Sequence, residues 1–129
     1  MTMTRRAAVL LLLLAAVSSC GRKEPPPPPA PAGEVVTGAY AYGNNVNTFR
    51  PCGTSEVLWV EAPPAVLAHL EREYAVKAKA AFETVIVTAR GTRGAQAEAG
   101  PGASYRGTFA MTELVSMRPL SGEECGENP

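Results

Sequence analysis

Small, aromatic and polar positions alternate along the first part of the folded region, which is typical of half-buried β-strands. Small and aromatic residues alternate over residues 37–42, the turn cluster Gly43-Asn44-Asn45 follows, and residues 46–50 continue the alternation. This pattern predicts a hairpin. A short apolar run over residues 56–61, closed by two prolines, predicts a third strand.

Hydrophobic positions change to helical spacing after Pro63 and Pro64, which suit the start of a helix. Glu73 and Lys77 stand four positions apart, in the favourable order for an ion pair on the solvent side. We therefore predict one amphipathic helix over residues 65–81. Its apolar side chains recur at helical spacing and are Leu67, Leu70, Tyr74, Ala78 and Ala81.

Two further strands are predicted toward the C-terminus. Residues 83–90 contain a β-branched run, and residues 104–117 alternate with period two. Between them, residues 91–102 are rich in Gly, Ala and Pro, which predicts a long, mobile loop. The expected inward face of the last strand consists of Tyr105, Phe109, Met111, Val115 and Met117.

The order of these elements predicts the fold. Three strands, a helix and two strands make up the small five-stranded OB-type barrel, in which the helix closes one end between strands 3 and 4. We therefore expect a mainly β, OB-like barrel domain over residues 34–125, followed by a short tail at residues 126–129.

Three short motifs in this region carry a resemblance to a known family. They are Gly38-x-Tyr40-x-Tyr42, Thr48-Phe49-x-x-Cys52-Gly53-Thr54, and the strand of Trp59 and Val60 with the helix after it. Over about residues 35–125 the chain resembles the C-terminal OB-fold domain of the NlpE outer-membrane lipoproteins. The resemblance implies a theme of envelope-stress sensing, surface contact and lipoprotein sorting. The separate N-terminal barrel of full-length NlpE, with its Cys-x-x-Cys motif, is not found here, so copper handling is not expected.

The first twenty residues have the pattern of an export signal. Arg5 and Arg6 precede an apolar run over residues 7–17, which is long enough for a signal sequence and too short to span a bilayer. The following Val17-Ser18-Ser19-Cys20-Gly21 resembles a bacterial lipobox. We predict a signal peptide over residues 1–19 and lipidation of Cys20, which becomes the mature N-terminus. The alternative is an ordinary secretory signal whose cysteine joins a disulfide.

Residues 20–33 are predicted to be a lipidated stalk. Five consecutive prolines fix φ and lack N–H donors, so an extended polyproline II segment of roughly 35 to 40 Å is expected. A docking motif for an aromatic groove is the alternative. Gly21, Arg22 and Lys23 follow Cys20 without an acidic residue. Because an acidic residue directly after the cysteine would favour retention at the inner membrane, its absence favours sorting to the periplasmic face of the outer membrane.

With Cys20 lipidated, Cys52 and Cys125 remain as an even pair in an oxidising compartment. The NlpE-like pattern likewise matches a cysteine after the second strand with one near the C-terminus. A structural disulfide is therefore predicted. The alternative is a redox-active pair, although Glu123, Glu124 and Glu127 beside Cys125 should disfavour a thiolate.

Charge and composition exclude several classes of function. Without residues 1–19 the chain keeps ten basic residues against twelve Glu, a formal charge of −2, so nucleic acid is not an expected partner. The chain has one histidine, His69, and no Asp, so a Ser-His-Asp triad or a zinc site cannot be assembled. His69 is expected to be solvated near Glu73. We expect no cofactor, no metal and no enzymatic activity.

Candidate binding residues are aromatic and basic. Tyr40, Tyr42 and Trp59 would form a stacking platform for sugars or oligonucleotides if they were exposed, or part of the core if they were not. Arg93, with Arg90 and Arg106 nearby in sequence, would face anionic lipid or peptidoglycan, or solvent alone.

These features predict a lipid-anchored periplasmic module that binds or senses without catalysis. Its expected partners are the membrane, through the anchor, and another envelope protein or peptidoglycan. The alternative is a lipoprotein inhibitor of a lysozyme-type muramidase, which would insert the loop at residues 91–102 with Arg93 into the enzyme's cleft.

Overall fold

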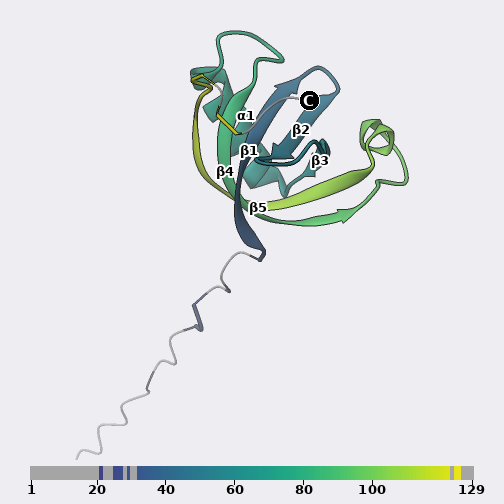
Figure 1. Ribbon diagram of the computed structural model, residues 1–129. Helices are drawn as coiled ribbons and strands as arrows, with labels where there is room; N and C mark the ends of the chain where they lie inside the picture. Colours follow the sequence, from purple (N-terminus) through teal and green to yellow (C-terminus); the bar gives the residue numbers. More distant parts are fainter. Residues whose placement is uncertain (1–20, 22–24, 28, 30–31, 123, 126–129) are drawn as a thin grey trace, which may run out of the picture.

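The computed structural model describes residues 21, 25–27, 29, 32–122 and 124–125 (Figure 1). The predicted signal peptide and Cys20 lie outside these residues. The described part of the chain forms a five-stranded barrel with one α-helix and one 3₁₀ turn. In chain order the elements are β1 (Glu34–Gly43), β2 (Val46–Pro51), β3 (Leu58–Glu61), α1 (Pro64–Lys77), β4 (Val85–Ala95), η1 (Pro101–Ser104) and β5 (Gly107–Pro119).

The strands close in the order β1-β2-β3-β5-β4. Neighbouring strands are antiparallel except β3 and β5, which are parallel with Trp59 opposite Thr108. The helix α1 lies between β3 and β4 in sequence and packs against β5. This arrangement confirms the predicted OB-like barrel.

The core of the barrel is built around aromatic rings. The rings of Phe49 and Phe109 lie 4.7 Å apart between centroids, and Tyr40 is fully buried beside them in the same cluster. The Tyr40 hydroxyl donates to Oδ1 of Asn47 at 2.8 Å, and Nδ2 of Asn47 donates to the carbonyl of Val60 at 3.3 Å. These bonds satisfy the polar groups that the barrel buries.

The strand β4 is longer than predicted. Its residues 91–95 belong to the sheet and pair with β5 as far as Ala95 opposite Gly107, so the expected loop at residues 91–102 is wrong over its first five positions. A Cβ at Gly91 would lie 2.5 Å from the carbonyl oxygen of Ala110 and 2.6 Å from the Phe109 ring. The glycine therefore permits close packing inside the sheet. The remaining connection carries η1.

The inward face of β5 also differs from the prediction. Val115 is 51% exposed, whereas Met111, Leu114 and Met117 are buried at intervals of three. The pairing with β4 skips Thr112 and Val115, so each is an extra residue in a β-bulge that reverses the phase of the alternation. A strict period of two therefore fails twice along this strand.

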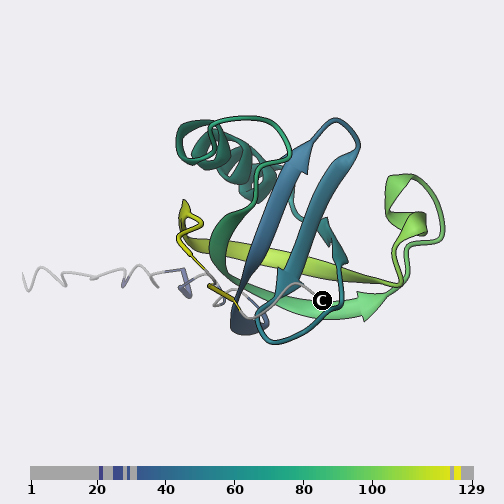
Figure 2. The same ribbon diagram turned by 45° about the horizontal axis from the view of Figure 1, so that its top comes forward.

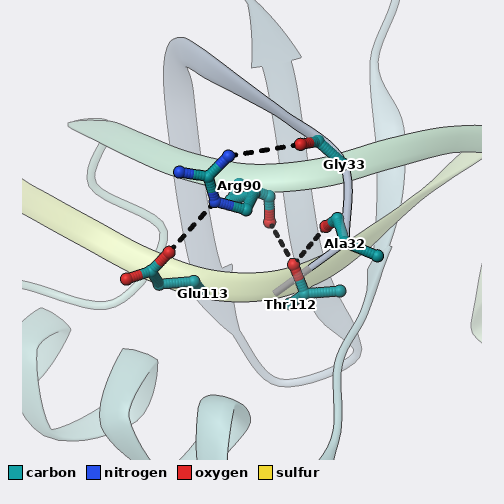
Figure 3. A network of polar contacts seen from close by, with 5 residues as sticks. All are labelled: Ala32, Gly33, Arg90, Thr112 and Glu113. Carbon is teal, nitrogen blue, oxygen red and sulfur yellow. Dashed lines mark hydrogen bonds and ion pairs between the residues drawn. The ribbon is translucent and has the colours of Figure 1, made fainter. Parts of the chain in front are cut away.

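The end of the proline-rich segment is fixed to the barrel by a network of polar contacts (Figure 3). The Thr112 hydroxyl donates to the carbonyl oxygen of Ala32 at 2.5 Å, and Nη1 of Arg90 donates to that of Gly33 at 3.3 Å. Nε of Arg90 also pairs with Glu113 at 3.2 Å. Gly33 has a φ of +108°, and a Cβ there would lie 2.3 Å from the carbonyl oxygen of Gly91, so no larger residue fits. The chain thus enters β1 along a fixed path.

A disulfide joins Cys52, just after β2, to Cys125, and this is the pairing expected from the sequence. The backbone N–H of Gly53 donates to the carbonyl of Cys125 at 3.3 Å. Arg118 at the end of β5 forms an ion pair with Glu124. The segment after β5 is therefore tied back to the barrel.

Candidate binding groove

The three aromatic residues considered as a stacking platform do not share a surface. Tyr40 is 0% exposed in the core, which rules it out as a platform residue. Trp59 points outward from β3 and stacks on Tyr105, with centroids 5.7 Å apart and planes inclined by 30°. A Cβ at Gly102 would lie 2.7 Å from Cδ1 of Trp59, so η1 covers part of the indole. Tyr42 lies at the largest of the cavities described below, which neither Tyr40 nor Trp59 lines.

The arginines are divided among different contacts. Nη1 of Arg93 pairs with Oε2 of Glu56 at 2.8 Å, and both side chains are about half exposed. Arg90 is engaged by Glu113 and Gly33, and Arg106 is exposed in the connection before β5. His69 lies half-buried on α1. Arg93 and Arg90 thus serve separate structural contacts.

A cavity of about 650 Å³ opens between the β1–β2 turn and the C-terminal half of α1. We call it the tyrosine groove. Its lining combines two tyrosines with polar side chains and with small residues, and we call the alanine methyl groups among these its floor. The lining residues are Tyr42, Gly43, Asn44, Asn45, Glu71, Tyr74, Ala75, Ala78, Lys79, Ala80 and Ala81.

The groove exists because α1 ends earlier than its apolar spacing predicts. Ala78 has an extended backbone, with ψ at 142°, so the helix stops at Lys77 and not at Ala81. The Glu83 carboxylate accepts the backbone N–H groups of Lys79 and Ala80, which fixes the turn after the helix. Ala78, Ala80 and Ala81 are the small residues of this turn, and their methyl groups line the cavity together with Lys79.

The segment after α1 is fastened to β1 beside the groove. The Tyr74 hydroxyl donates to the carbonyl of Glu83 at 2.6 Å, and the backbone N–H of Phe82 donates to that of Tyr42 at 2.9 Å. The Phe82 ring lies against Gly43, where a Cβ would approach it to 2.3 Å. These two hydrogen bonds therefore fix the turn after α1 beside the end of β1, where the groove lies.

The tyrosine side chains are rigid, neutral donors. The Tyr42 hydroxyl donates to Oε1 of Glu71 at 2.7 Å, and this bond raises the pKa of Tyr42. Burial raises the pKa values of Tyr40 and Tyr74, whose rings meet edge to face with centroids 5.8 Å apart. Protonated phenols at neutral pH supply fixed hydrogen bonds and not a base.

The sequence did not single out most of the groove. Asn44 and Asn45 were assigned to a turn, and the alanines at 78 and 81 to a continuing helix. The available signal is that four of the seven residues after Tyr74 are alanines, whose side chains are too small to cover the end of a helix. The groove-lining role of these residues depends on where α1 ends.

Other kinds of site were sought in the described residues. Within residues 21, 25–27, 29, 32–122 and 124–125, no group of three or more His, Cys, Asp or Glu side chains is placed to hold a metal ion. No helix in the same part of the chain is both long and apolar enough to cross a membrane.

Comparisons with known proteins place the barrel in a family. Searches among curated proteins and among solved structures found no match. A family model described as the NlpE C-terminal OB domain matches residues 31–126, which include every strand and the helix. The match agrees with the closed five-stranded barrel and its helix between β3 and β4. The chain belongs to the family of the NlpE C-terminal OB domain.

Proposed function

We propose that this protein is a lipoprotein whose barrel is a non-catalytic binding and sensing module, tethered through Cys20 to the periplasmic face of the outer membrane. Its family supports an envelope lipoprotein-type module. The apolar run and the lipobox-like Val17-Ser18-Ser19-Cys20 support the anchor. Gly21, Arg22 and Lys23 support sorting away from the inner membrane.

The position of the tyrosine groove relative to the tether carries the proposal. The tether reaches the barrel at Ala32 and Gly33, immediately before β1, whereas Tyr42 and Gly43 line the groove at the other end of that strand. The ten residues of β1 span roughly 30 Å at about 3.3 Å per residue. Figures 1 and 2 show the start of β1 and the β1–β2 turn on opposite sides of the barrel. The groove would therefore open away from the membrane, toward a partner in the periplasm.

Membrane fractionation with metabolic palmitate labelling tests the anchor. The wild-type chain should be labelled and should sediment with the outer membrane on a density gradient. Cys20→Ala should lose the label because the acylated thiol is gone. Ser19→Ala keeps a small residue before the cysteine and should behave as the wild type. Recovery of the labelled wild type with the inner membrane would contradict the sorting, and an unlabelled wild type would contradict the anchor.

The muramidase-inhibitor alternative gains no specific support from the structure. It relied on Arg93 in a protruding loop, whereas Arg93 lies in β4 and its guanidinium is paired with Glu56. We therefore propose a single function, with the tyrosine groove as the binding site.

A further inference from the structure

We propose that the tyrosine groove binds a glycan of N-acetylated amino sugars with short peptide stems that bear carboxylate groups, which is the chemistry of a peptidoglycan strand. This inference rests on the proposed function, because the tether places the groove in the periplasm. It names the class of ligand that the groove residues are suited to hold.

The polar wall of the groove matches the hydroxyl and acetamido groups of such a glycan. The exposed amides of Asn44 and Asn45 each offer donors and an acceptor at the β1–β2 turn. Oε1 of Glu71 is held by Tyr42, which orients the carboxylate so that its second oxygen can accept from a sugar hydroxyl. These groups lie on elements that the backbone contacts fix in place.

The floor of the groove is apolar but shallow. It consists of alanine methyl groups beside the tyrosine rings, and the lining contains no Leu, Ile or Met. Protein interfaces usually depend on large anchors buried in well-packed pockets. A floor of methyl groups suits the C–H faces of a sugar ring and the methyl of an acetamido group. The cavity of about 650 Å³ lies within the usual range for small-ligand sites.

Charge and reach favour a cell-wall polymer over a lipid surface. Lys79 is exposed on the rim and supplies an ammonium group for a ligand carboxylate. If residues 21–33 form the polyproline stalk that the sequence predicts, they would add roughly 40 Å at about 3.1 Å per residue. The length of β1 adds roughly 30 Å at about 3.3 Å per residue. The groove would then lie well beyond the lipid headgroups.

Co-sedimentation with purified peptidoglycan sacculi tests the inference. The full lipidated chain in detergent micelles should sediment with sacculi and should be released by soluble disaccharides that keep their carboxylate-bearing peptide stems more effectively than by chitin oligomers of equal sugar number. Ala75→Trp fills the groove and should weaken binding about tenfold, equivalent to roughly 1.4 kcal/mol. Val76→Trp is the matched control, because Val76 is the next residue of α1, is 76% exposed and lies outside the lining.

A second variant tests the charge. Lys79→Gln should weaken sedimentation and abolish the preference for the carboxylate-bearing disaccharide over chitin oligomers. Circular dichroism of each variant separates loss of binding from loss of folding. Binding that survives Ala75→Trp in a folded variant, or that falls equally in Val76→Trp, would overturn the assignment to the groove. Failure of the wild type to sediment would overturn the glycan assignment.

Cross-linking in cells separates this inference from the proposed function. A photoreactive residue at position 81, an exposed position of the lining that the groove-filling variant leaves unchanged, should yield adducts with glycan fragments. Adducts with an envelope protein, without sedimentation on sacculi, would overturn the glycan assignment and leave the binding module standing. Loss of the anchor in the fractionation experiment would instead overturn the proposed function.

Discussion

At the residue scale, Tyr40 shows how a single hydroxyl supports the barrel. Tyr40→Phe removes the donor to Oδ1 of Asn47, which is 8% exposed. Because the amide oxygen is then buried without a partner, the free energy of unfolding should fall by about 1 to 3 kcal/mol. Urea denaturation measures this change. Tyr105→Phe removes a half-buried hydroxyl outside the core and should change stability much less. Equal losses in the two variants would contradict the role of the buried bond.

The tyrosines also predict a loss of stability in alkali. The pKa values of Tyr40, Tyr42 and Tyr74 are raised in the folded chain, by burial at Tyr40 and Tyr74 and by the bond to Glu71 at Tyr42. Above the ordinary tyrosine pKa of about 10, the unfolded chain loses protons that the folded chain retains. The stabilisation that the protonated tyrosines contribute is therefore complete below about pH 10. It declines as the pH rises from there through the pKa values of these tyrosines in the folded chain. Melting temperatures across this range should fall less steeply in Tyr42→Phe, and a flat profile in the wild type would contradict the raised pKa values.

At the element scale, the sequence predicts the type and order of the elements but not where each one ends. Hydrophobic periodicity identifies β1, β2, β3 and α1 because each buries one face locally. The bulges at Thr112 and Val115 depend on pairing with β4, which local alternation does not contain. The end of α1 depends on Glu83, six residues beyond Lys77 in the chain.

The candidate site was less predictable than the fold for the same reason. Tyr40 and Tyr42 follow the same strand alternation, yet one is fully buried and the other reaches a cavity at the strand end. Tyr105 was placed in the last strand, so its stacking on Trp59 was not anticipated. The groove arises where the β1–β2 turn meets the turn after α1, and such a meeting is a property of the closed barrel.

The disulfide ties the segment after β5 to the end of β2 and should stabilise the folded barrel. The Cys52–Cys125 bond closes a loop with a sequence separation of 73, for which chain entropy gives about 4 kcal/mol. The free energy of unfolding of the double variant Cys52→Ser, Cys125→Ser, measured by urea denaturation, should be lower by about 4 kcal/mol. Reductant should lower the stability of the wild type similarly and leave the double variant unchanged. A loss well under about 1 kcal/mol would show that the bond does not constrain the unfolded chain as this model requires.

At the scale of the whole molecule, the tether and the groove are connected through β1. Thr112 and Arg90 fix the chain at the start of that strand, and Tyr42 contributes to the groove at its end. The bonds to Ala32 and Gly33 thus determine which end of the barrel follows the stalk (Figure 3). The groove thus lies at the opposite end of β1 from the point where the proposed tether joins the barrel.

The stalk should therefore limit access to the ligand without changing affinity. Deleting the five prolines at residues 25–29 shortens an extended stalk by roughly 15 Å, at about 3.1 Å per residue. Sedimentation of the purified chain with sacculi should be unchanged, because the groove is intact. The yield of cross-links from position 81 in cells should fall, and reinsertion of five prolines next to Pro31 should restore it. An unchanged yield in the shortened chain would mean that the barrel meets its partner closer to the membrane than the length of the stalk implies.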